Sequence, residues 1–219
     1  MPDLHFEIER AAPVRYAQTP MLAFMLKLSN VVPQEQIQSI MLQYQVWIEP
    51  AGRRYVEQEQ SLLLDLFGEP DRWNRTVRSL LWTRGTVLVP AFSDSRVVDL
   101  DAPCTFDFNV AVTKYFYALK DGVVPLRFMF SGTVFYVPAD SDDGTMQVSQ
   151  IPLEKEAPYR LSVLVWKGMM DSYYPNTHWL CLSNHVFDQL YRYKIEYGLT
   201  TWEQVVEQIV PVEVEGRKP

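Results

Sequence analysis

Three residues in the C-terminal part of the sequence have types and a spacing that could hold a metal ion. His178, Cys181 and His185 form the pattern H-x-x-C-x-x-x-H. If Cys181 lay on a helix, His185 would follow one turn later, and imidazole and thiolate together suit zinc or nickel. A metal-dependent hydrolase that uses these three residues is therefore one function that the sequence allows.

A second interpretation of the same segment is structural. Ser183 is a typical helix N-cap, which would leave His178 and Cys181 in an extended segment before that helix. Cys181 is then an apolar residue of the run WLCL, both histidines lie on the surface, and Asp188 is the one nearby candidate for a fourth ligand. We expect no cofactor, and we keep the metal site as the alternative.

Signatures of other reactive sites are missing from the sequence. It contains no G-x-x-x-x-G-K-[ST], no G-x-G-x-x-G and no G-x-S-x-G. Cys104 lies in an alternating apolar row, where burial raises the pKa of a thiol and makes it a small hydrophobic residue rather than a nucleophile. These observations favour a protein that acts without catalysis.

Composition and charge limit the classes of partner. The 219 residues carry a net charge of −7, which opposes binding to nucleic acid and to anionic lipid. No run approaches the ~20 apolar residues of a membrane helix, and two cysteines are too few for a disulfide framework. Asp3, Glu7 and Glu9 stand where a signal peptide would have an apolar run. We expect a cytoplasmic protein.

Hydrophobic residues that alternate with polar ones predict a mainly β fold. Side chains on a strand point to opposite faces in turn, so runs with period two indicate strands with one buried face. The two clearest runs cover 104–112 and 126–136; Asp121-Gly122 between them is a turn signal, and we expect an antiparallel pair. Further alternating runs cover 4–10, 21–30, 37–48, 83–92, 95–103, 146–153 and 159–166. About eight short strands predict an antiparallel, immunoglobulin-like β-sandwich.

Two regions depart from this alternation and predict helices. Residues 57–67 are good helix formers that end at Gly68, so 56–81 forms a helical excursion between strands. Near the C-terminus, Ser183 is expected to cap one helix, and Thr200 with Glu203 forms a capping box for the next. We therefore expect a sandwich over residues 1–165 and a helical appendage over 166–219, packed together as one domain.

Aromatic residues are concentrated in the expected helices. Tyr and Trp favour protein interfaces because an apolar ring ends in a polar group. The same rings could instead seal the sandwich, and a carbohydrate-binding module could use Trp47 or Trp82. The candidate interface consists of Trp73, Trp166, Tyr173, Tyr174, Trp179, Tyr193 and Tyr197. We expect a non-catalytic protein-binding or assembly factor.

Several blocks of the sequence resemble an uncharacterised bacterial family that carries a domain-of-unknown-function label. They are LLDLFGEPDRW, LWTRGTVLVPAF, VDLDAPCTFDFNVAVTKYFYAL, PLRFMFSGTVFY and EKEAPYRLSVLVWKGMMDSYYPNTHWLCL. The resemblance covers nearly the whole chain. Members of that family are often encoded among accessory genes of a nickel-iron hydrogenase. The resemblance thus implies an accessory role, with a hydrogenase subunit or maturation factor as the partner, and it transfers no catalytic residue.

Overall fold

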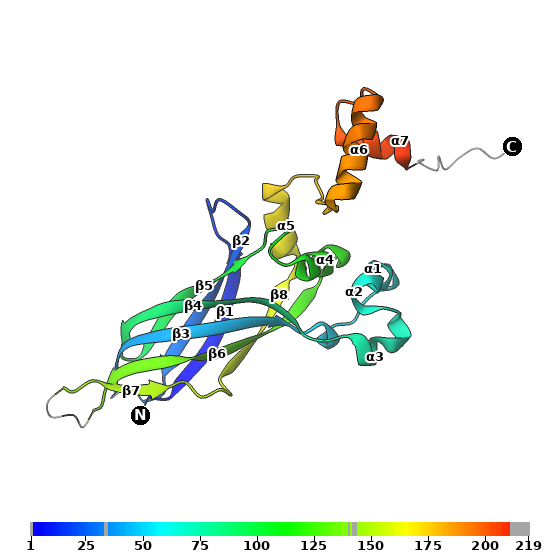
Figure 1. Cartoon of the computed structure of the whole chain (residues 1–219). Coiled ribbons are helices and arrows are strands. Elements are labelled where there is room, and N and C mark those ends of the chain that lie inside the picture. The colour runs from blue at the N-terminus through cyan, green and yellow to red at the C-terminus, as the bar shows by residue number, and fades with distance from the viewer. Residues whose placement is uncertain (1, 33–34, 140, 142–143, 211–219) are drawn as a thin grey trace. The chain divides into compact units, whose positions relative to one another are not determined.

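The computed structural model describes residues 2–32, 35–139, 141 and 144–210 (Figure 1). They form an α+β fold with two antiparallel sheets. The chain divides into two compact units: the sheet unit, which ends at Thr177, and the helical unit, which begins at His178. None of the helices in these described ranges is long and apolar enough to cross a membrane.

The larger sheet is built around β6 (Val123–Val137), which contains the strand expected at 126–136. On one edge β6 pairs with β3 (Gln36–Ile48), which in turn pairs with β4 (Leu80–Phe92). On the other edge β6 pairs with two shorter strands, β7 (Gln147–Gln150) and β8 (Glu156–Ser162). All these pairings are antiparallel.

The smaller sheet has the order β1 (Leu4–Pro13), β2 (Met21–Asn30) and β5 (Ser95–Pro103), again antiparallel. Along β2 every second side chain is buried, as the alternation of its sequence predicts. The expected antiparallel β fold is thus confirmed as two sheets, while the immunoglobulin-like arrangement stays a prediction.

Aromatic side chains join the facing layers of the two sheets. Phe6 of β1 stacks on Phe130 of β6 with ring centroids 4.5 Å apart, and Phe24 of β2 lies 5.0 Å from Phe128. The centre of the core is therefore filled from both sheets, and ring pairs of this kind contribute about 0.5–1.5 kcal/mol each beyond the burial of their area.

The segment after β5 differs from the prediction of a strand at 104–112. It turns after Pro103 and forms helix α4 (Val110–Ala118). The reason is Asn109, whose side-chain oxygen accepts a hydrogen bond from the backbone N–H of Val112 at 3.1 Å and so caps the helix. Its amide nitrogen donates to the carbonyl oxygen of Leu81 at 2.9 Å, which holds the start of α4 against β4.

The helical excursion at 56–81 is present between β3 and β4. A short 3-10 helix, η1 (Pro50–Gly52), leads into α1 (Glu57–Leu62) and α2 (Leu64–Phe67), which gather at one end of the strands (Figure 1). Gly68 ends α2 with a positive φ of 71°, as expected for a glycine at this position. A second 3-10 helix, η2 (Pro70–Arg72), and α3 (Trp73–Thr76) complete the excursion.

The sheet unit ends with α5 (Val163–Tyr173). The strand expected at 159–166 is therefore wrong in its second half, because β8 ends at Ser162. The apolar run VLVW fits a strand or a buried helix equally well. The buried residues Val163, Trp166 and Met170 show the helical spacing, and this becomes visible only when the run is followed to its end.

The helical unit contains α6 (Asn184–Glu196) and α7 (Trp202–Ile209). Ser183 caps α6 as predicted, accepting a hydrogen bond from the N–H of Val186 at 3.4 Å. The capping box of α7 lies one residue later than predicted and consists of Thr201 and Gln204.

Gly132 of β6 lies at a position where β6 and β3 approach each other closely. Gly132 has a φ of +139°, and a Cβ there would collide with the carbonyl oxygen of Met41 on β3. We expect Gly132→Ala to lower the free energy of unfolding by about 3 kcal/mol, because it adds backbone strain and a steric clash.

Gly168 is the matched control for this substitution, because no atom lies within 4 Å of a Cβ built there, inside α5. Gly168→Ala should leave stability unchanged or raise it by about 1 kcal/mol. Urea unfolding of both variants checks the prediction, and equal stability of the two would contradict it.

Candidate functional site

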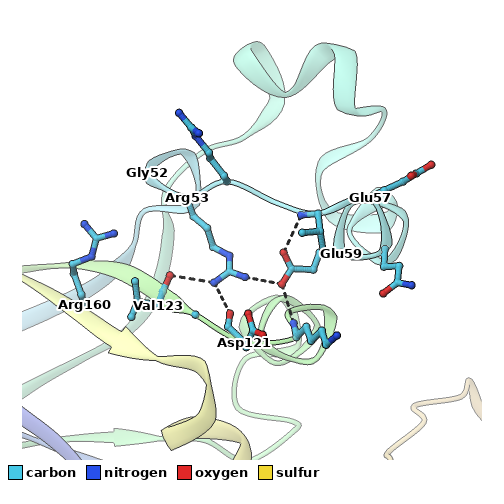
Figure 2. A pocket seen from close by; sticks show the side chains of 12 residues that line it. Gly52, Arg53, Glu57, Glu59, Asp121, Val123 and Arg160 are labelled. Carbon is cyan, nitrogen blue, oxygen red and sulfur yellow. Dashed lines mark hydrogen bonds and ion pairs between the residues drawn. The ribbon is translucent and has the colours of Figure 1, made fainter.

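An open depression lies between the segment that leads into α1 and the turn that leads into β6 (Figure 2). Its volume is about 890 Å³. Charged side chains of both signs line it, among them Arg53, Arg54, Glu57, Glu59, Lys120, Asp121 and Arg160. The chemistry available in this depression depends on which of these groups are already engaged.

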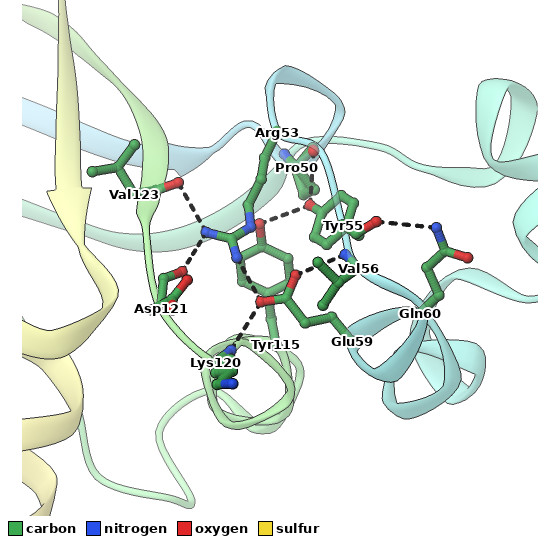
Figure 3. A network of polar contacts seen from close by, with 10 residues as sticks. All are labelled: Pro50, Arg53, Tyr55, Val56, Glu59, Gln60, Tyr115, Lys120, Asp121 and Val123. Carbon is green, nitrogen blue, oxygen red and sulfur yellow. Dashed lines mark hydrogen bonds and ion pairs between the residues drawn. The ribbon is translucent and has the colours of Figure 1, made fainter.

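Arg53 is the central group of the depression, and its guanidinium is held on three sides (Figure 3). It donates to the Glu59 carboxylate at 2.6 Å and to the carbonyl oxygens of Asp121 and Val123 at 2.8 and 3.2 Å. The Arg53 side chain is 9% exposed and the Glu59 side chain 4%. The pair is thus removed from water. In this buried position, the loss of either partner would leave the other charge without compensation.

Glu59 accepts two further hydrogen bonds from the backbone. The N–H of Lys120 lies 2.8 Å from one carboxylate oxygen, and the N–H of Val56 lies 3.3 Å from the other, which is the reach-back half of a capping box. The ion pair therefore fastens the start of α1 to the turn between α4 and β6. Both of its charges are used to hold the fold.

Two tyrosine hydroxyls lie next to this ion pair. The oxygens of Tyr55 and Tyr115 are 2.8 Å apart, and Tyr55 donates to the carbonyl oxygen of Pro50 at 2.7 Å. Burial raises the pKa of Tyr55 to about 12, against smaller lowering effects of Tyr115 and Arg53. Burial also raises the pKa of Tyr115. Both groups stay protonated at neutral pH, so they extend the structural network.

The predicted metal ligands lie at the start of the helical unit. Cys181 is exposed in the irregular segment before α6, His178 precedes it, and His185 is in the first turn of the helix. Nowhere in the described parts of the chain does a group of three or more His, Cys, Asp or Glu side chains have a geometry that could hold a metal ion. The structure therefore does not bring these three side chains together as a ligand set.

Cys104 is a core residue, as its row of apolar neighbours predicts. Its thiol is buried and donates to the carbonyl oxygen of Ala102 at 3.2 Å. Burial raises the pKa of the Cys104 thiol to about 12, so the thiolate is scarcely populated at neutral pH.

The candidate interface residues of the sheet unit mostly seal its core. Trp166 is buried and stacks on Phe116 with centroids 4.9 Å apart, so its ring is not on the surface. Tyr173 donates to the carbonyl oxygen of Ala17 at 2.7 Å. The remaining two, Trp73 and Tyr174, are half-buried and pack against the core cluster.

The two tryptophans considered for sugar binding differ in exposure. Trp82 is buried, and its ring lies 5.8 Å from that of Phe24. Trp47 is half-buried and donates through its ring nitrogen to the side chain of Gln45 at 3.0 Å.

Three candidate interface residues belong to the helical unit. Trp179 and Tyr197 are exposed, and Tyr193 is half-buried and donates to the side chain of Gln208 at 3.3 Å. Tyr193 on α6 and Tyr197, the residue that caps its C-terminal end, have ring centroids 4.4 Å apart, in agreement with their predicted i, i+4 contact.

An apolar surface with more members than these three residues lies on helices α6 and α7. We name it the apolar face; it consists of Phe187, Tyr191 and Ile195 on α6 and Trp202, Val206 and Ile209 on α7. These side chains are 38–64% exposed. Trp202 connects the helices, with its ring centroid 5.3 Å from that of Phe187 and 6.3 Å from that of Tyr191.

The aromatic residues of the sequence do not by themselves predict the apolar face. Its members repeat every three or four residues along each helix, which is the pattern of an amphipathic helix. Ile195, Val206 and Ile209 could have been found from that spacing, because they continue stripes that begin at Phe187 and Trp202.

The chain belongs to DUF6084, a family of unknown function, whose model matches residues 1–218. The predicted membership of a domain-of-unknown-function family is thereby confirmed. The match itself carries no link to hydrogenase genes. No curated protein matches the sequence.

The buried ion pair generates a stability prediction. Replacing Glu59 by Gln, or Arg53 by Met, should lower the free energy of unfolding of the sheet unit by about 3–5 kcal/mol, because each change leaves one buried partner unsatisfied. The double variant should lose much less than the sum of the two.

Lys114 and Asp65 supply the control, since they form an ion pair of 3.3 Å on the surface, with side chains 53% and 79% exposed. Asp65→Asn should cost less than about 1 kcal/mol. Chemical unfolding of all four variants measures the effects. Similar losses for Glu59→Gln and Asp65→Asn would show that the Arg53–Glu59 pair is not a fastening point.

Proposed function

We propose that this protein acts without catalysis, as a protein-binding or assembly factor that holds its partner through the apolar face. One observation carries the proposal. Among the described residues of the helical unit, 178–210, only Val205 is fully buried, while the six side chains of the apolar face stay 38–64% exposed. Exposed apolar surface of this extent on one pair of helices is typical of a protein interaction site.

The size of the apolar face is sufficient for a specific contact. From the area of aromatic and aliphatic side chains and their exposed fractions, it presents on the order of 600 Å². Phe187, Tyr191 and Trp202 are the expected central anchors, because aromatic side chains carry much of the binding energy at protein interfaces.

The buried polar groups of the sheet unit also support a role without catalysis. Its buried charges and hydroxyls are engaged with one another: Arg53 with Glu59, and Tyr55 with Tyr115. These contacts hold the helical excursion against the turn that leads into β6.

The identity of the partner rests on the family resemblance alone. By that resemblance we propose a subunit or maturation factor of an oxidoreductase, such as a nickel-iron hydrogenase. The apolar face indicates what kind of surface the partner presents: we expect that surface to be apolar and close to neutral in charge.

Affinity capture from the native host tests the proposal with matched baits. Wild-type protein should recover a stoichiometric protein partner. Bait with Tyr191→Asp and Val206→Asp should lose it, because both substitutions place a charge in the apolar face. Leu88→Asp is the control, since Leu88 is an exposed apolar residue on β4 of the sheet unit, away from the two helices of the face.

Recovery with the control bait but not with the face variant would support the proposal. If no protein depends on the apolar face for its capture, the face is not the site of partner binding and the proposed function is wrong.

A further inference from the structure

The apolar face also fits a second copy of the same chain. We propose that two copies pair through this face and form a homodimer, which covers the face until another partner binds. The inference rests on the proposed function, because both use the same surface. It is carried by three observations: the small core of the helical unit, the area of the face and the charges at its edge.

The helical unit has a small core, because only Val205 is fully buried among its described residues, 178–210. A single core rarely supplies enough stability below about 70–80 residues, and units as short as His178–Pro219 commonly add a disulfide, a metal or oligomerisation. Cys181 is the single cysteine after residue 177, so the unit cannot form an internal disulfide. Its described side chains also provide no group of three or more metal ligands. Association with a second copy of the chain would stabilise the unit by covering its exposed apolar residues.

The area of the face matches a small specific interface. Two copies would together remove on the order of 1,200 Å² from water, which is at the lower end of the range for specific protein complexes. Pairing two such helix pairs would give a four-helix arrangement with Phe187, Tyr191 and Trp202 of each copy at its centre.

The edge of the face is self-complementary in charge. Asp188 and Arg192 lie one turn apart on α6, beside Tyr191 and Ile195 in the helical order. No ion pair joins them to each other or to any other residue that the structure describes.

A twofold axis makes each contact occur twice. If two α6 helices pack antiparallel across such an axis, Asp188 of each copy can meet Arg192 of the other. A second copy can therefore offer opposite charges along the α6 edge and an apolar surface at the centre.

Sedimentation velocity of the full chain over a concentration series tests the inference. The chain has a mass of 25.5 kDa, and the wild-type protein should sediment as a species of twice that mass. Tyr191→Asp with Val206→Asp should weaken dimerisation by at least about 100-fold, as expected when two central residues are lost. Leu88→Asp should stay dimeric.

A charge exchange tests the proposed arrangement. Asp188→Arg should weaken the dimer roughly 2- to 10-fold, the range for surface ion pairs. Adding Arg192→Asp to the same chain should restore the wild-type affinity. A structural effect of the first substitution would not be reversed by the second.

The outcomes separate this inference from the proposed function. A wild-type protein that stays monomeric, or a dimer that is insensitive to the face variant, overturns the homodimer. A monomer that still captures another protein through the face leaves the proposed function intact. A dimer without a face-dependent partner refutes the proposed function alone. Unchanged unfolding of the sheet unit in each variant excludes a general loss of fold.

Discussion

Apolar side chains have to be covered, and the two units of this chain meet that constraint in different ways. The sheet unit satisfies it internally: the inner faces of its two sheets bring Phe6 onto Phe130 and Phe24 onto Phe128. The helical unit buries a single described side chain, Val205, and leaves both helices with exposed apolar stripes. Since burial of apolar surface is the dominant stabilising effect in folding and association, a further contact on these stripes would add stability.

The polar chemistry of the sheet unit has a structural explanation. The depression seen in Figure 2 contains a buried ion pair whose carboxylate accepts from Arg53 and from two backbone N–H groups. A cleft with charged residues invites a catalytic interpretation. Here Arg53 and Glu59 bind each other and backbone groups of the turn before β6, and these contacts fasten a helical excursion to the sheet.

The sequence predicted those elements whose pattern is decided by local alternation. Alternation predicted the strand at 126–136, and the residue type of Ser183 predicted the helix cap. Residues 104–112 alternate equally well, yet one side chain, Asn109, closes a helical turn and contacts β4, and that tertiary contact overrides the alternation. Two contacts of this ion pair could not be predicted from the sequence: Arg53 with the carbonyl of Asp121, and Glu59 with the N–H of Lys120. They join residues 68 and 61 positions apart, so they depend on the turn before β6 being brought back to α1. The proposed binding surface was recognisable in part, since aromatic rings pointed to the C-terminal helices but not to Ile195 or Val206.

The central claim is that another polypeptide covers the apolar face. Photo-crosslinking from benzoylphenylalanine in place of Tyr191 measures this most directly, with the same group in place of Leu88 as the reference. Our account predicts products between two chains from position 191, either a second copy or a partner, and few from position 88. Crosslinks from position 191 that stay within one chain and lead to the sheet unit would contradict it.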